Sequence, residues 1–195
     1  MEKTYKTEPR QMIASRRMPR DKEGRFVFPR VIVRKPKKGD YHPLSARDIR
    51  IAFKKLPLEF FYGLKEIELR ARYKNVCEQP LGKYSPRDKK IILYSVPRRL
   101  WEAKNVSDGQ RSAYLRYGAQ IKEGDSGLTV EWKVKVGLIL FFLIEVFFHE
   151  LGHHYVHQYK CKRKPAIDIR LNEWLADLHA SRLERLAFKK SCKGG

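Results

Sequence analysis

Five consecutive residues, His149-Glu150-Leu151-Gly152-His153, form an HExxH motif, and their types and spacing are those of a metal-dependent hydrolase. Residues four apart on a helix lie one turn above each other, so His149 and His153 can direct both imidazoles at one metal ion. Glu150 lies about 100° further round the helix, within reach of a water on that ion. The motif therefore predicts two metal ligands and a carboxylate base.

A second group of acidic residues follows in the segment NEWLAD, residues 172–177. Glu173 lies 20 positions after His153, which leaves room for one helix to end at a turn containing Pro165 and for another to begin. Asp177 is one turn beyond Glu173, so the two carboxylates share a face. We expect Glu173 to be the third metal ligand and Asp177 to orient a ligand histidine from the second coordination sphere.

The helix that carries the motif holds a further candidate, His157, one turn beyond His153. It can replace a ligand or line the cleft, and the plainer reading is a surface histidine one turn past the site. The candidates for stabilising an oxyanion are Tyr155, Tyr159 and His179. Ligation by nitrogen and oxygen alone, with one open position, favours Zn²⁺.

With HExxH followed by ExxAD, the chain resembles the gluzincin metallopeptidases over residues 130–185. Their pattern is one helix that carries HExxH and a later helix that carries a ligand glutamate. Upstream, residues 62–69 and 82–94 look like the small sheet of the minigluzincins, the minimal members of that group. The resemblance implies a compact peptidase domain in which the two histidines and Glu173 bind zinc.

The length and composition suit one domain with extensions, because 195 residues with 42% apolar content can build one core. We predict a basic N-terminal extension at 1–40, a single zincin-like metallopeptidase domain at 41–190 and a tail at 191–195. The expected fold is α+β and zincin-like. It has a small, mostly antiparallel sheet packed on the active-site helix, followed by a C-terminal ligand-bearing helix.

Local patterns predict the elements that must position these residues. An edge strand is expected in 26–33, where Pro29 interrupts β-prone residues. The substrate-binding edge is expected at 90–96. The predicted elements are a helix at 45–55 capped by Ser45, a strand around 67–69, a hairpin of 82–84 with 90–96, and helices at 112–121, 138–159 and 170–189.

The formal net charge is +21, and residues 1–40 alone carry 13 Lys/Arg against 5 Asp/Glu. Such a field attracts polyanions. Solubility, or the habit of an organism rich in charged residues, is the plainer explanation. The sequence contains no recognisable nucleic-acid-binding motif. Nucleic acid is therefore kept as an alternative partner, and the extension is hypothesised to restrain a latent enzyme or to dock a polyanion.

The longest apolar run, residues 136–148, has 13 residues, fewer than the roughly 20 that cross a bilayer. We expect a buried core helix and no membrane span, with a membrane-embedded peptidase as the alternative. Residues 1–25 contain no apolar signal-peptide core, and the cysteines are odd in number and widely spaced. The expected location is cytoplasmic. The three cysteines are Cys77, Cys161 and Cys192.

These observations predict a zinc metalloendopeptidase that hydrolyses peptide bonds in peptides or proteins, with Glu150 as general base toward a metal-activated water. An alternative from another class is a nucleic-acid-associated protein in which the zinc fold serves binding or regulation. A protease that cuts DNA-bound proteins would combine the two. The sequence indicates neither the peptide preference nor the oligomeric state.

Overall fold

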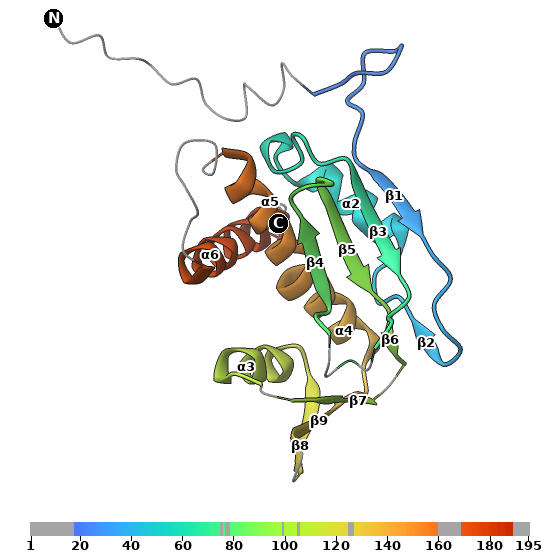
Figure 1. Cartoon of the computed structure of the whole chain (residues 1–195), viewed down its shortest axis with the longest axis vertical. Helices are drawn as coiled ribbons and strands as arrows, with labels where there is room; N and C mark the ends of the chain where they lie inside the picture. Colours follow the sequence, from blue (N-terminus) through green and yellow to red (C-terminus); the bar gives the residue numbers. More distant parts are fainter. Residues whose placement is uncertain are drawn as a thin grey trace, which may run out of the picture.

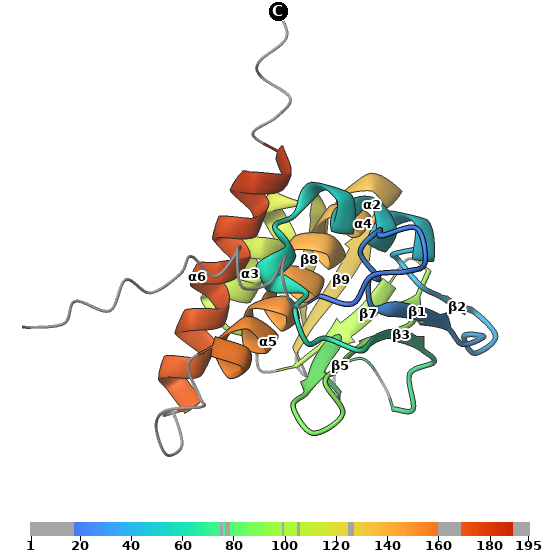
Figure 2. The same cartoon turned by 90° about the horizontal axis from the view of Figure 1, so that it is seen from above.

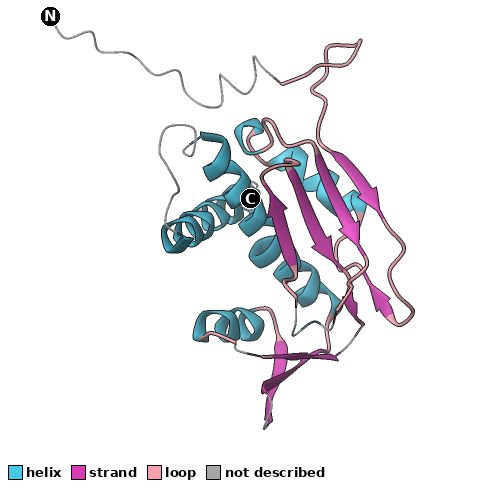
Figure 3. Ribbon diagram, in the orientation of Figure 1, coloured by secondary structure: helices cyan, strands magenta, loops and turns pink. Residues whose placement is uncertain are grey.

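The computed structural model describes residues 18–74, 76, 79–98, 100–104, 106–124, 127–159 and 169–188. The first 17 residues of the predicted extension, the predicted tail and all three cysteines lie outside these ranges. The fold is α+β, as predicted: strands gather on one side and most helices on the other (Figure 3).

The main sheet has four strands in the order β1-β3-β5-β4 (Figure 1). Strands β1 (Arg30–Val33), β3 (Glu66–Arg70) and β5 (Lys90–Tyr94) run parallel, and β4 (Gly82–Ser85) is antiparallel to β5. The expectation of a mostly antiparallel sheet is therefore wrong here, because two of its three pairings are parallel. Parallel neighbours need long crossover connections, which local alternation of residues does not reveal.

One edge of this sheet, β1, agrees with the prediction, and the other edge, β4, does not. Strand β1 is an edge strand, as Pro29 predicted, and it belongs to the sheet although it falls within the predicted extension. The other edge is β4, whereas residues 90–96 were expected there. Strand β5 is interior, paired with β3 on one side and β4 on the other, so β4 alone presents a backbone edge toward the helices.

The crossover between β1 and β3 contains helix α2 (Ala46–Lys55) and the short 3₁₀ helix η1 (Leu58–Phe60). Ser45 caps α2 as predicted: its Oγ accepts from the Asp48 N–H at 3.2 Å, and the Asp48 carboxylate accepts from the Ser45 N–H at 2.8 Å. Such a capping box satisfies two otherwise unpaired donors and sets where the helix begins. A two-stranded pair, β2 (Asp40–Tyr41) with β6 (Val96–Pro97), lies beyond the main sheet.

A second, antiparallel sheet and a helix form the lower part of the molecule in Figure 1. The sheet joins β7 (Leu100–Ala103), β9 (Gly127–Trp132) and β8 (Ala119–Gly124), and helix α3 (Asp108–Arg116) precedes β8. The helix expected at 112–121 is thus only partly right. A capping box of Ser107 with Gln110 starts it earlier, and the chain turns into β8 after it.

The helix predicted at 138–159 is one continuous helical run through the core (Figure 2). It comprises α4 (Lys135–Phe141), the π-helical segment Phe142–Phe148 and α5 (His149–Tyr159). Within the described residues it is the one helix long and apolar enough to cross a membrane. However, 56% of its apolar window is buried inside the protein, and a soluble core helix passes the same test. The absence of a membrane span stays a prediction.

The outer face of the main sheet carries a network of charges around Glu68. Arg70 donates to its carboxylate through Nε at 2.9 Å and Nη2 at 2.7 Å, and Lys90 Nζ donates at 3.1 Å. The Arg70 hydrogen bonds lower the pKa of Glu68 to about 2, with Lys90 adding to them and burial opposing them. A carboxyl whose pKa is depressed on folding stabilises the fold above its unfolded pKa, here 4.5.

We expect Glu68→Gln to lower the unfolding free energy at pH 7 by about 1 kcal/mol or more, because two charge-assisted hydrogen-bond partners lose their acceptor charge. The deficit should shrink as the pH falls from 4.5 toward 2, where the wild-type carboxylate is protonated. Urea unfolding at pH 7 and pH 3 measures both values. The exposed Glu102→Gln serves as a control, and a wild-type-to-variant gap that is constant with pH would contradict the assignment.

Candidate metal centre

Helices α5 and α6 (Ile169–Phe188) bring three candidate ligands together. One ligand atom from each of His149, His153 and Glu173 lies within 4.8 Å of the other two. The Nε2 atoms of the histidines are 3.0 Å apart, and Glu173 Oε2 is 3.3 Å and 3.5 Å from them. A tetrahedron with bonds of about 2.0–2.1 Å has edges of about 3.3 Å, so these atoms fit three corners around one metal ion.

The approach of the two helices is set by Gly152 on α5 and Ala176 on α6. A Cβ placed on Gly152 would lie 2.5 Å from the Ala176 carbonyl oxygen and 2.9 Å from its Cα. Only a residue without a side chain therefore allows this crossing. Ala176 lies between Glu173 and Asp177 in the sequence, so the same close contact carries both carboxylates to the histidines.

Asp177 contacts His149 at Nδ1, the ring nitrogen that is not directed at the other two ligands, as predicted. Its Oδ1 lies 2.7 Å from His149 Nδ1, so the Nδ1–H donates and Nε2 keeps its lone pair for the site. Burial acts to lower the pKa of His149, but the Asp177 hydrogen bond and the nearby carboxylates outweigh it and raise this pKa. The pKa of His153 is lowered, by burial and by the charge of His149. The second imidazole is thus kept neutral, the form that binds metals.

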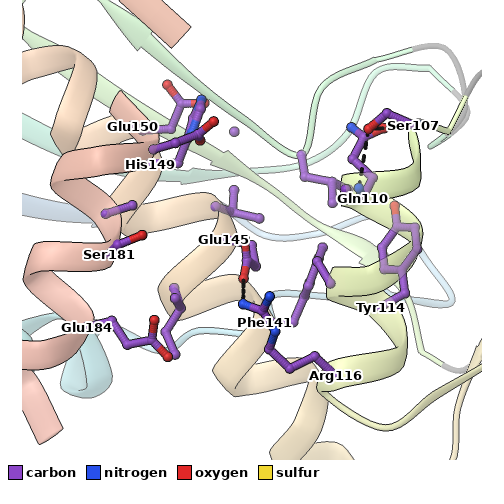
Figure 4. A pocket seen from close by; sticks show the side chains of 18 of the residues that line it. Ser107, Gln110, Tyr114, Arg116, Phe141, Glu145, His149, Glu150, Ser181 and Glu184 are labelled. Atoms are coloured by element: carbon purple, nitrogen blue, oxygen red, sulfur yellow. Dashed lines mark hydrogen bonds and ion pairs between the residues drawn. The ribbon is translucent and has the colours of Figure 1, made fainter. Parts of the chain in front are cut away.

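Glu150 lies next to His149 at a cavity and packs against the edge strand β4 (Figure 4). Its side chain is almost fully buried, and a Cβ on Gly82 would come within 3.0 Å of its Cγ. Burial raises the pKa of Glu150 to about 7, although the charge of His149 and a hydrogen bond from the Tyr84 backbone lower it. A carboxyl with a pKa near 7 can both accept and return a proton at neutral pH.

This cavity of about 610 Å³ is lined by His149, Glu150, Glu173 and Asp177, among others (Figure 4). Helix α3 forms its far wall with Gln110 and Tyr114, and no sequence pattern predicts that these two residues lie at the site. At the distal end, Glu145 accepts from the Tyr117 hydroxyl at 3.1 Å and pairs with Arg116 at 3.5 Å. The capping signal at Ser107 predicts that a helix begins there, but it does not say what the helix faces.

The remaining histidines of α5 do not join the three-ligand group. His157 turns to the sheet, with Nδ1 at 3.3 Å from the Tyr84 hydroxyl. The fully buried His154 accepts from the same hydroxyl at Nδ1 (3.1 Å) and donates from Nε2 to the Tyr62 carbonyl (3.1 Å). Burial lowers the pKa of His154 to about 4, so it stays neutral and links α5 to the sheet.

None of the three candidates for oxyanion stabilisation lines the cavity. Tyr155 is buried between Phe60, at 4.6 Å between ring centroids, and His179, at 4.4 Å. Tyr159 packs beside Tyr155 at 4.9 Å. The tyrosine that does line the cavity is Tyr114 of α3.

We expect Gly152→Ala to destabilise the fold by about 1–3 kcal/mol and to weaken metal binding, because its methyl group would overlap the Ala176 backbone. Chemical unfolding and a metal-competition titration measure the two effects. Gly109→Ala is the matched control. Its Cβ would meet only Ser107 Oγ, at 3.8 Å, so stability should be unchanged or slightly increased. Equal effects of the two substitutions would refute the close-contact argument.

We expect Asp177→Asn to weaken metal affinity by about 10- to 100-fold, since the His149 ring loses its charged acceptor. The control is Glu184→Gln, which removes a carboxylate two turns further along α6, at the same cavity. That variant should bind metal within a few-fold of wild type. Similar losses of metal affinity in both variants would indicate that the overall negative charge of the cavity matters. They would argue against a specific role for the hydrogen bond from His149 to Asp177.

Comparison with known proteins adds no relative to this picture. No protein family, no curated protein and no solved structure matches the chain. What the centre can do therefore follows from the geometry and chemistry of its own side chains.

Proposed function

We propose that this protein is a zinc-dependent metallopeptidase with a zincin-like fold of the gluzincin type. The observation that carries the proposal is the set of three ligand atoms from His149, His153 and Glu173 at the edge lengths of a tetrahedron. Beside them lies Glu150, a buried carboxyl with a pKa of about 7. Ligands and base together are what hydrolysis by a metal centre requires.

Zinc is the metal that suits this ligand set best. Two imidazole nitrogens and one carboxylate oxygen in a tetrahedral arrangement leave a fourth corner open, as in catalytic zinc sites. When bound, the ion supplies Lewis acidity toward a water and a carbonyl oxygen. Asp177 keeps the His149 ring in the orientation that presents Nε2.

The proton transfers fall to Glu150. It is held between α5 and β4, and its own pKa lies near neutrality. In the proposed reaction it takes a proton from the attacking water and then gives it to the departing amine. Its burial keeps bulk water from competing for that proton.

A peptide is the substrate that fits the surroundings of the centre. Strand β4 is the edge of the main sheet, and its Gly82 lines the same cavity as Glu150. An extended peptide can add to such an edge as a further strand, which would lay its backbone past the three ligands. The absence of a side chain at Gly82 lets β4 lie against Glu150, because a Cβ there would come within 3.0 Å of the Glu150 Cγ.

The test is a comparison of wild type with Glu150→Gln, in which the amide cannot take up a proton. We expect both proteins to bind about one zinc ion per chain, because Glu150 is not a ligand. Cleavage of casein or a peptide mixture should fall by about 10²-fold or more in the variant. Metal analysis and the cleavage assay give the two readouts.

Two controls make this outcome interpretable. The exposed Glu102→Gln should retain full cleavage, and Glu173→Gln should lose zinc as well as activity. Equal cleavage by wild type and Glu150→Gln would reject the proposed base. Zinc-loaded wild type that cleaves no peptide but binds DNA in a salt-dependent manner would favour the nucleic-acid-associated alternative.

A further inference from the structure

Helix α6 has a third face, which points neither to the core nor to the cavity. Four of its large apolar side chains are exposed, to between 41% and 59%. They are Leu171, Trp174, Leu178 and Phe188. The first three follow the i, i+3, i+7 spacing of a single stripe, so they lie together on the outside of the helix. We call these four residues the outer stripe.

The charges on α6 are sorted by face. All of its acidic residues, Glu173, Asp177 and Glu184, line the metal cavity. At 100° per residue, Arg170, Arg182 and Arg185 fall instead on the same side as the outer stripe, with Arg185 between Trp174 and Leu178. The centre of the outer face is thus apolar and basic, and the carboxylates lie along its cavity side, where Asp177 is next to Arg170 and Phe188.

The arrangement of the helices leaves this face open. Figure 2 shows α6 running along one flank of the molecule, opposite the main sheet, with α5 against its inner side. The inner side is fixed by buried residues such as Leu175 and Leu183. Arg182 is anchored by Glu59 at 3.0 Å and lies over the Phe60 ring. The outer stripe lies on the opposite side of α6 from these buried residues, and its four side chains are partly exposed.

We propose that the outer face of α6 is a peripheral binding surface for an anionic lipid bilayer. A tryptophan flanked by leucines partitions into the headgroup region, and Arg185, which lies between Trp174 and Leu178 on the helix, can reach the lipid phosphates. The charge of +21 on the chain adds long-range attraction to such a surface. The helix lies on the bilayer rather than crossing it, because three carboxylates and three arginines cannot enter the hydrocarbon.

The other occupants of such a face fit less well. In a symmetric dimer centred on the outer stripe, Arg185 would face the same apolar and basic surface of the second copy. An acidic partner protein would satisfy the arginines, but an exposed tryptophan at the centre of a basic stripe is what interfacial helices present. The proposal goes beyond the peptidase function and does not depend on it.

The chain provides its own reporter for the experiment. Of its three tryptophans, Trp101 and Trp132 are buried, and Trp174 is 59% exposed. A change of emission on lipid binding therefore comes from Trp174. The full chain is mixed with vesicles of phosphatidylcholine alone, or of phosphatidylcholine with about one third phosphatidylglycerol. We expect a blue shift and flotation with the anionic vesicles, and quenching by brominated acyl chains.

Variants separate insertion of the stripe from general attraction by charge. Leu178→Ser and Arg185→Glu should each weaken binding to the anionic vesicles by about 10-fold. Trp174→Ser should do the same by flotation. The matched charge control, Lys38→Glu, reverses an exposed charge on the loop between β1 and β2 and should leave the emission shift intact. Far-UV circular dichroism checks that each variant is folded.

Three results would overturn the proposal. One is binding to anionic vesicles without any change in tryptophan emission, together with full binding by Leu178→Ser. Another is an emission shift that depends on protein concentration without lipid, which would indicate self-association of α6. The third is equal binding to vesicles with and without phosphatidylglycerol, which would remove the role of the arginines.

Discussion

The contact between the backbones of α5 and α6 at Gly152 and Ala176 is the constraint on which the metal centre depends. With no side chain between them, the helices approach until a Cβ at Gly152 would overlap the Ala176 carbonyl. Glu173 and Asp177 flank Ala176 closely in sequence, so one reaches the two imidazoles and the other reaches the rear of His149. If α5 and α6 were further apart at this point, the carboxylates of Glu173 and Asp177 would both move away from the histidines.

On its opposite side, α5 is held by the sheet. His154 joins it to Tyr62 and Tyr84, and the glycine at position 82 of β4 lets the strand lie against Glu150. The Glu150 side chain is therefore buried against β4 on one side and faces the cavity on the other. Although the protein is strongly basic overall, five of the described residues that line this cavity are acidic, and Arg116 is the one lysine or arginine among them.

The sequence predicts much of this centre because its chemistry is local. His149 and His153 are one turn apart, Glu173 and Asp177 are another turn, and helical period alone places each pair on a face. The hairpin of β4 with β5 and the cap at Ser45 are likewise local signals. That α5 and α6 meet at all depends on a long-range contact, which the sequence suggests only through the need of a zinc site for a third ligand and through the ExxAD resemblance.

The features that the sequence did not predict are those set by topology. The crossover that makes β1, β3 and β5 parallel leaves no periodic trace, so the edge was placed at 90–96 rather than at β4. Tyr155 and His179 were candidates because both lie near the motif or its partner helix. Since α5 is buried on most sides, nearness along the chain does not say whether a side chain faces the cavity or the core.

The π-helical segment Phe142–Phe148 ends immediately before His149. A π turn holds one residue more than an α turn, so the segment shifts the rotational phase of everything after it. If the segment closed to a regular α-helix with all its residues retained, its continuation would turn by about 100°. The two imidazoles would then face away from α6 although every ligand residue was still present. The π conformation of this aromatic stretch, as much as the motif itself, thus determines where the histidines point.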